Sequence, residues 1–209
     1  MAPSRAALGR LPTYLSHIRK LQAAGETSTS ATAIAKALGM GEVQVRKDLS
    51  AVSGTGKPKT GYLVSDLADA LEKHLGCHHK TLAVLVGAGE LGRALLNYGG
   101  FADYGAEIAA AFDIDPARTT PAANGKPVYP MERLEEFLRE TPVSIGIITV
   151  PAGAAQEVCD RLVASGVRAI WSFAPAQLQT PPNVIVQQEN LALSLACLNA
   201  RREDYGQEK

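Results

Sequence analysis

The sequence predicts an α/β protein with a helical part over residues 1–79, a parallel β-sheet covered by helices over residues 80–187, and a terminal helix and tail over residues 188–209. In the first part, apolar residues recur every three or four positions. After residue 80, apolar stretches of strand length alternate with helical ones, the order typical of a parallel sheet. Charge changes at the same boundary. Residues 1–79 hold ten Lys/Arg and six Asp/Glu (net +4), and residues 80–209 hold eleven and fifteen (net −4). This asymmetry favours two domains with different partners.

The first part is expected to form four helices, over residues 11–24, 31–38, 42–52 and 66–75. Residues 27–30 supply good N-cap side chains for the second helix. We expect Ser65 to cap the fourth helix and Gly76 to end it. Residues 53–61 (SGTGKPKTG) hold three glycines and a proline, which predicts a loop or hairpin tip with residues 62–64 as its returning strand.

The second part is expected to form strands over residues 81–86, 107–112, 143–150 and 167–173, with helices over 90–98, 131–140, 152–165 and about 188–203. The last helix carries Leu191, Leu195 and Leu198 on one stripe, so it is amphipathic.

Several function classes are disfavoured by composition. No apolar run approaches the ~18–20 residues of a membrane span, and the N-terminus lacks the apolar stretch of a signal peptide. The three cysteines are far apart without a CxxC motif, which suits a reducing cytoplasm. Residues 77–79 (Cys-His-His) do not predict a metal site, because three consecutive side chains cannot all face one ion.

A glycine-rich motif directly follows the first expected strand. The motif is formed by Gly87, Ala88, Gly89, Glu90, Leu91 and Gly92. In such a loop the first glycine allows a tight turn, the second lets a pyrophosphate approach the backbone, and the third lets helix and strand pack closely. The free N–H groups of the following helix then face the phosphates. The motif therefore predicts a Rossmann-type dinucleotide site.

Asp113 ends the second strand, where an acid is expected to bind the adenosine ribose hydroxyls. Its charge would repel a 2′-phosphate, which favours NAD(H) over NADP(H). A structural protein or one that binds coenzyme A is a further alternative, but Asp113 favours a ribose with free hydroxyls, whereas coenzyme A carries a 3′-phosphate.

The sequence gives little sign of dehydrogenase chemistry. Such enzymes need a group that passes a proton near the nicotinamide. Residues 80–209 contain no histidine, and Tyr98 has no lysine partner in a Tyr-x-x-x-Lys pair. Binding without turnover is favoured. An NAD-dependent oxidoreductase with a small appended helical domain remains the alternative.

Residues 31–52 have the arrangement of a helix-turn-helix. Ala35 lies four residues before the turn glycine Gly39, so two helices can cross closely. The second helix offers Gln44, Arg46, Lys47 and Ser50 on its outer positions. Arg and Gln can read base edges, while Lys and Ser suit phosphates. Lys57 and Lys59 lie in a loop that could be a wing touching DNA.

These motifs together resemble the Rex family, the redox-sensing transcriptional repressors of bacteria. The matching segments are residues 11–15 (LPTYL), 44–50 (QVRKDLS), 61–62 (GY), 86–92 (VGAGELG), 112–116 (FDIDP), 149–151 (TVP) and 173–175 (FAP). The resemblance implies a homodimer with a winged-helix domain, an NADH/NAD+-binding Rossmann domain and a C-terminal helix swapped into the partner. It further implies operator binding when NADH is scarce and release when NADH binds.

NAD+ and NADH differ at the nicotinamide ring, and Tyr98, Thr149, Pro151 and Phe173 are the candidates for contacts near that ring, with Val150 as a further cofactor-binding candidate. The resemblance also identifies departures. Ser16 and Asn190 fall where the family has an arginine and an aspartate that pair across the dimer. Ser172 stands in place of the usual asparagine, and residues 53–60 lack the usual phenylalanine.

Overall fold

The computed structural model describes residues 3–57 and 60–207. The chain divides into two compact units. One unit extends to His79 and includes Asp103–Gly105, and the other contains the remaining residues.

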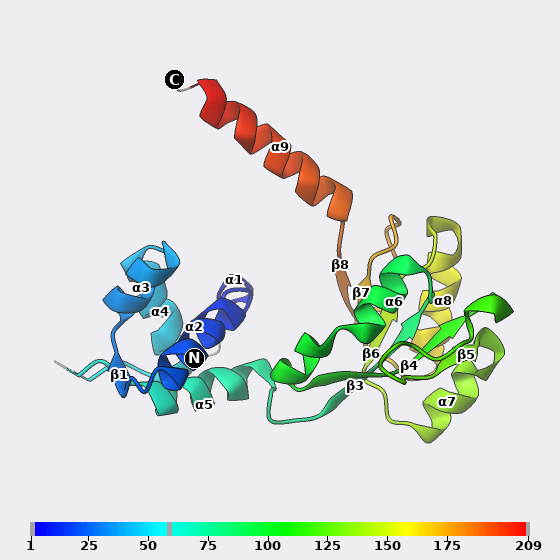
Figure 1. The fold of residues 1–209 in the computed structure, drawn as a ribbon, viewed down its shortest axis with the longest axis horizontal. Coiled ribbons are helices and arrows are strands. Elements are labelled where there is room, and N and C mark those ends of the chain that lie inside the picture. The colour runs from blue at the N-terminus through cyan, green and yellow to red at the C-terminus, as the bar shows by residue number, and fades with distance from the viewer. Residues whose placement is uncertain (1–2, 58–59, 208–209) are drawn as a thin grey trace. The chain divides into compact units, whose positions relative to one another are not determined.

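The first unit is a small helical domain with a two-stranded sheet (Figure 1). Its elements are α1 (Arg5–Leu8), α2 (Leu11–Ala23), β1 (Ser28–Thr29), α3 (Ala31–Leu38), α4 (Glu42–Ser53), β2 (Tyr62–Leu63) and α5 (Val64–Leu75). The four predicted helices are confirmed. Their apolar stripes meet in one core that includes Leu15, Ile34, Leu49 and Leu67.

The turn between α3 and α4 follows the predicted chemistry. The Ser30 side chain caps α3 by accepting a 3.1 Å hydrogen bond from the backbone N–H of Ala33. Gly39 ends α3 in the left-handed conformation, with φ of 64°. Glycine adopts this conformation at little cost in free energy, because it has no Cβ. Ala35 is buried between the helices.

Two predictions around residue 64 were wrong. Val64 belongs to α5 rather than to a strand, and Ser65 lies inside the helix, where its hydroxyl donates to Asp66. The reason is tertiary. Val64 is buried in the core, and its N–H donates to the carbonyl of Thr27 at 3.0 Å. The strand β2 pairs antiparallel with β1, which precedes α3. The hairpin tip itself is closed by an antiparallel bridge between Lys57 and Gly61.

The second unit contains a six-stranded sheet in the order β5-β4-β3-β6-β7-β8 (Figure 1). All five pairings are parallel. The strands are β3 (Thr81–Val86), β4 (Ala106–Asp113), β5 (Val128–Pro130), β6 (Ile145–Ile148), β7 (Ala169–Ser172) and β8 (Ile185–Gln188). The intervening elements are α6 (Glu90–Asn97), η1 (Gly99–Tyr104), η2 (Pro116–Arg118), η3 (Met131–Arg133), α7 (Leu134–Glu140) and α8 (Ala152–Ala164). The last two residues of η1 belong to the first unit. This is the predicted doubly wound Rossmann-type sheet.

The continuous apolar character of β3 follows from burial on both faces. Val84 and Val86 contact a core beneath α7 and α8, whereas Ala83 and Leu85 belong to the opposite core, which includes Leu96 of α6. The sequence analysis missed the edge strands β5 and β8. They are three and four residues long, and β8 is half polar, so neither shows a distinct pattern.

The terminal helix α9 spans Leu191–Gln207, so it starts three residues later than predicted, because β8 occupies residues 185–188. Asn190 caps it, accepting a 2.8 Å hydrogen bond from the N–H of Leu193. Leu191, Leu193, Leu195 and Leu198 are between 59% and 68% exposed. Leu191, Leu195 and Leu198 form the predicted stripe, but Leu193 lies on the opposite side of α9, so the helix is less amphipathic than predicted. Exposed leucines around a helix are typical of a segment that packs against another surface.

Truncation of Leu49 tests the assignment of the first unit's core. Leu49 of α4 is fully buried, so Leu49→Ala should lower the free energy of unfolding by about 2–5 kcal/mol. Denaturant titration followed by circular dichroism measures this loss. Val43, on the same helix, is 80% exposed, and Val43→Ala should leave the midpoint almost unchanged. Equal effects would contradict the assigned inner face of α4.

Candidate functional site

The main candidate site lies at the carboxyl ends of β3, β4 and β6. The strand order reverses direction between β3 and β6, and ligands of doubly wound sheets bind in the crevice at such a point. A cavity of about 670 Å³ opens there. It is lined by Val86, Gly87, Gly89, Asp113, Ile114, Asp115, Arg118, Met131, Thr149, Val150, Pro151, Ala154, Glu157, Val158 and Arg161. Six of these residues were predicted as cofactor-binding: Gly87, Gly89, Asp113, Thr149, Val150 and Pro151.

Two of the three glycines are required by the protein's own packing. Gly87 has φ of 102°, and a Cβ there would lie 2.9 Å from the backbone of Thr149. A Cβ on Gly92 would collide with the carbonyl oxygen of Gly87. Thr149 reinforces this contact, because its hydroxyl donates to the same carbonyl at 2.7 Å.

Gly89 is different. Its backbone conformation (φ −70°, ψ −168°) is open to any residue. A Cβ there would meet only Arg118 Nη1, at an ordinary 3.7 Å. Gly89 lines the cavity, so a Cβ would project into space that the protein leaves free. The surrounding fold does not require glycine here, whereas a diphosphate held against the backbone would.

Asp113 is buried and joins the glycine loop to the end of β4. Its Oδ2 accepts a 2.6 Å hydrogen bond from the backbone N–H of Ala88, and its Oδ1 accepts a 2.8 Å hydrogen bond from the backbone N–H of Asp115. Arg118 Nη1 lies 3.8 Å from Oδ2. Each carboxylate oxygen has two lone pairs, so Asp113 can support the loop and still accept hydrogen bonds from a ribose.

The sequence analysis missed an apolar wall beside Asp113. Ile114 is 81% exposed and lines the cavity together with Met131 and Ala154. An exposed isoleucine directly after the acid that is predicted to bind a ribose fits a surface for a flat ring such as adenine. Its position after Asp113 could have identified it. Met131 and Ala154 come together with it only through the fold.

The other predicted cofactor residues do not line this cavity. Glu90, Leu91 and Gly92 lie in the first turn of α6, where backbone N–H groups can face an anion, whereas the N–H of Ala88 is donated to Asp113. Tyr98 and Phe173 belong to an aromatic row: Tyr98, Phe101, Trp171 and Phe173 follow one another with ring centroids 4.7–5.8 Å apart. Tyr98 is 59% exposed. Next to Phe173, the Ser172 hydroxyl is buried without a hydrogen-bond partner.

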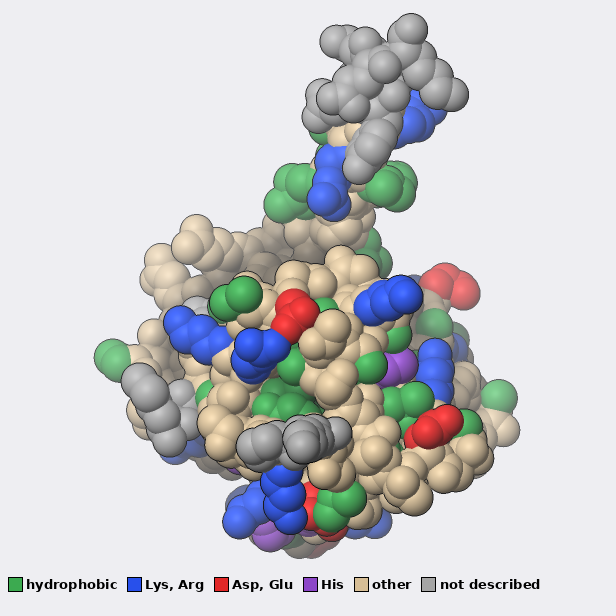
Figure 2. Space-filling view, turned by 90° about the vertical axis from the view of Figure 1, so that its left-hand side faces the viewer, with side chains coloured by type: hydrophobic (Ala, Val, Ile, Leu, Met, Phe, Trp, Pro, Cys, Tyr) green, Lys and Arg blue, Asp and Glu red, His purple; other side chains and the backbone are tan. Residues whose placement is uncertain are grey.

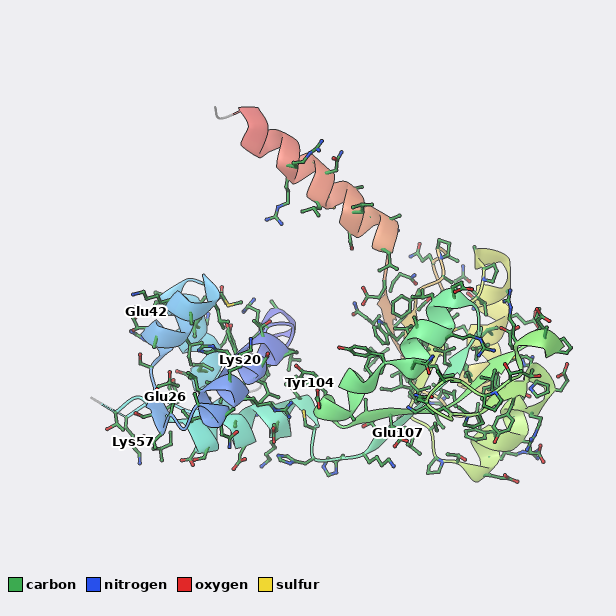
Figure 3. The ribbon with its side chains drawn as sticks, in the orientation of Figure 1. Lys20, Glu26, Glu42, Lys57, Tyr104 and Glu107 are labelled. Atoms are coloured by element: carbon green, nitrogen blue, oxygen red, sulfur yellow. The ribbon has the colours of Figure 1, made fainter. Side chains whose placement is uncertain are left out.

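A second candidate site lies on the first unit. Arg46 and Ser50 of α4 line a groove with Lys57 of the hairpin tip and the N-terminal residues of α3. Arg46 pairs with Glu42 one turn earlier. Figure 3 labels Glu42 at the start of α4 and Lys57 at the hairpin. Lys59 lies outside the described residues.

Charge on this unit agrees with a nucleic-acid surface. Lys47 and Gln44 are exposed on α4. Figure 2 shows Lys and Arg side chains spread over this side of the molecule. A helix-turn-helix with exposed Arg, Lys and Gln on its second helix has the side chains that contact phosphates and base edges.

The buried Asp48 supports α4 from inside and was not singled out in the sequence. It is 4% exposed. Its Oδ2 accepts from Arg10 Nε at 2.7 Å and from the Tyr14 hydroxyl at 2.8 Å, and its Oδ1 accepts from Arg10 Nη2 at 3.0 Å. Burial opposes ionisation of Asp48, but these hydrogen bonds outweigh it and hold the pKa of the carboxyl below its ordinary value. The network anchors α4 to α2.

The described residues offer neither a metal-binding cluster nor a membrane-spanning helix. Within residues 3–57 and 60–207, no cluster of three or more His, Cys, Asp or Glu side chains could hold a metal ion. In the same ranges, no helix combines the length and apolar character needed to cross a membrane.

Comparisons with known proteins agree with the division of the chain into a helical first unit and a second unit with a parallel sheet. Residues 4–50 match a family described as "Putative DNA-binding protein N-terminus", and residues 78–176 match one described as "CoA binding domain". The redox-sensing transcriptional repressor Rex of Porphyromonas gingivalis is 43% identical over 91% of this chain and 88% of its own length. Rex of Treponema denticola is 40% identical over 94% and 93%.

Solved structures show the same fold. A crystal structure of RSP in complex with β-NAD+ and operator DNA matches with a TM-score of 0.91 and 32% identity, over 99% of this chain and 95% of that one. RSP in complex with β-NADH matches with a TM-score of 0.84 and 31% identity over the full length of both. RSP is described as a Rex-family repressor. Identity of about 40% over nine-tenths of the chain shows that this protein belongs to the Rex family of redox-sensing transcriptional repressors.

Proposed function

We propose that this protein binds operator DNA as a cytoplasmic homodimer and releases it when NADH occupies the cavity of the second unit, with NAD+ competing. The observation that carries the proposal is Gly89. The fold has no need of glycine there, but a dinucleotide does. Related proteins are named redox-sensing repressors, and a related structure holds NAD+ together with operator DNA.

The ligand would lie across the carboxyl edge of the sheet. Its adenine would contact Ile114, its ribose hydroxyls would donate to Asp113, and its diphosphate would face Gly89 and the N-terminus of α6. The nicotinamide would extend toward Thr149, Pro151 and the aromatic row that includes Tyr98 and Phe173. An apolar environment favours the neutral reduced ring over the cationic oxidised one, which gives NADH its advantage.

The DNA contacts would come from the first unit. Gln44 and Arg46 would reach base edges, while Lys47, Ser50, Lys57 and Lys59 would contact the backbone or the minor groove. A dimer must present its two α4 helices about one DNA turn apart. Because the proposed DNA contacts and the cavity belong to different units, NADH would act by favouring a dimer arrangement with the wrong spacing.

Dimerisation would use α9. Its four exposed leucines would leave it marginal as a lone helix, and a second copy of this chain would cover them. In the first unit, Ser16, His17, Lys20 and Tyr104 line a groove of about 450 Å³ beside α2. The family resemblance brings Ser16 and Asn190 together across the dimer, so we place the start of the second copy's α9 at this groove.

Oxidoreductase chemistry is the weaker candidate. The Rex family consists of repressors rather than enzymes, and relatives match over nearly the whole chain. The cavity lining includes Asp113, Asp115, Glu157, Arg118 and Arg161 but no His, Tyr or Lys to pass a proton to a substrate. Tyr98, toward which the nicotinamide would extend, is not part of a Tyr-x-x-x-Lys pair.

Ligand linkage tests the proposed function directly. If NADH weakens operator binding, saturating operator must weaken NADH binding by the same factor. NADH affinity should be measured by calorimetry with and without the operator, at one salt concentration, with NAD+ as the comparison. We expect operator to reduce NADH affinity by about 5–150-fold and NAD+ affinity by less. Equal NADH affinities in both conditions would contradict redox-controlled release.

Two glycine variants separate ligand binding from folding. Gly89→Ala should keep the unfolding midpoint close to wild type, because its Cβ meets no backbone, but should weaken NADH binding at least tenfold by blocking the diphosphate. Gly92→Ala should instead lower the unfolding midpoint, because its Cβ collides with Gly87. Calorimetry and thermal unfolding measure the two effects. Unchanged NADH affinity in Gly89→Ala would place the ligand elsewhere.

A charged substitution on the leucine stripe of α9 tests whether this helix forms the dimer interface. Leu195→Glu places a carboxylate on a side chain that is 68% exposed in the single chain, so the monomer should tolerate it, whereas a covered interface should not. Light scattering should show a monomer. Ala196→Glu, on an exposed side of the same helix that is turned away from the stripe of Leu191, Leu195 and Leu198, adds equal charge as a control and should retain more dimer. A stable Leu195→Glu dimer would exclude this face as the interface.

A further inference from the structure

The buried carboxylate of Asp48 has one contact that anchoring α4 to α2 does not explain. Besides its bonds to Arg10 and Tyr14, Oδ1 lies 3.4 Å from the side-chain nitrogen Nε2 of Gln44. Gln44 lies one turn earlier on α4 and is exposed. A residue inside the fold therefore contacts a residue on the outer, DNA-facing side of the same helix.

The direction of this contact is chemically determined. Arg10 donates two hydrogen bonds to Asp48, one to each carboxylate oxygen, and forms an ion pair with it. The carboxylate is therefore ionised and can only accept hydrogen bonds. A glutamine amide has a donating NH2 end and an accepting oxygen end. Only the NH2 end can face Asp48, so the carbonyl oxygen of Gln44 is directed away from it.

We propose that Asp48 is a positioning residue for base readout, which fixes the Gln44 amide so that its carbonyl oxygen faces the DNA and selects a base carrying an exocyclic amino group. In the major groove that group is N6 of adenine or N4 of cytosine, whereas guanine and thymine present acceptors. Adenine fits best, because the second N–H of Nε2 remains free to donate to its N7. This inference rests on the proposed operator binding.

Amino-deleted operators provide the first test. An operator is selected from random DNA by the wild-type protein, and affinities are measured with purine replacing adenine, or pyrimidin-2-one replacing cytosine, at each half-site position. At one position the deletion should cost wild type roughly tenfold in affinity and should cost Gln44→Met nothing. If no position shows this pattern, or if Gln44 depends instead on guanine or thymine acceptors, the proposal is overturned.

Asp48→Asn tests the positioning itself. The asparagine amide can donate, so the Gln44 amide can turn over and present its NH2 end to the DNA. The preferred base at the Gln44 position should change from adenine or cytosine toward guanine or thymine. A uniform loss of affinity with the base order unchanged would show that Asp48 only supports the helix, and would overturn the proposal. If Asp48→Asn does not fold, the comparison of wild type with Gln44→Met decides.

Tyr14→Phe is the matched control. It removes a 2.8 Å hydrogen bond from the same carboxylate without touching the contact to Gln44. It should lower the unfolding midpoint while retaining the wild-type base preference. Binding by wild type that is NADH-sensitive but has no base preference would overturn this inference alone, whereas absence of any operator binding would overturn the proposed function.

Discussion

The close contact among Gly87, Gly92 and Thr149 is the constraint on which the second unit depends. A Cβ at Gly87 or Gly92 would collide with neighbouring backbone atoms. Because glycine has no Cβ, α6 can start directly against the end of β3, and Thr149, which follows β6, can pack against the glycine loop. This packing aims the N-terminus of α6 at the crevice between β3 and β6. It also brings the N–H of Ala88 within 2.6 Å of Asp113. The cavity at the carboxyl ends of β3, β4 and β6 thus results from a backbone approach that only glycine permits.

Each unit is organised around a buried aspartate. Asp48 and Asp113 are 4% and 5% exposed, and burial of a carboxylate is costly unless donors surround it. Asp48 accepts hydrogen bonds from side chains on α2 and α4, so it fixes the helix that would enter DNA. Asp113 accepts from two backbone N–H groups, so it fixes the loop that would hold the diphosphate. In both units a carboxylate inside the fold orients groups that face the ligand.

The departures from the family pattern have local explanations in part. Asn190 caps α9 through the N–H of Leu193, so the position retains a structural role without the charge of an aspartate. Ser16 is exposed and lines the groove beside α2. Since the arginine and the aspartate are both replaced, no charge is left unpaired at this position of a dimer. Nothing in the structure explains why Ser172 is buried without a hydrogen-bond partner.

The sequence by itself determined the fold class, the helix-turn-helix and the position of the dinucleotide loop, because each depends on neighbours in the chain: apolar periodicity, capping residues and glycine spacing. It could not locate β5 and β8, which are too short to carry a pattern, nor the start of α5, where burial of Val64 overrides the capping tendency of Ser65. In the sequence, nothing distinguishes Asp48 from the exposed charged residues of the same helix. Only the tertiary structure, by bringing Arg10, the residue before α2, and Tyr14 of α2 against it, made that carboxylate a buried acceptor. Ile114, Met131 and Ala154 likewise form one wall only after the strands pair, because contacts between distant residues leave no trace in local spacing.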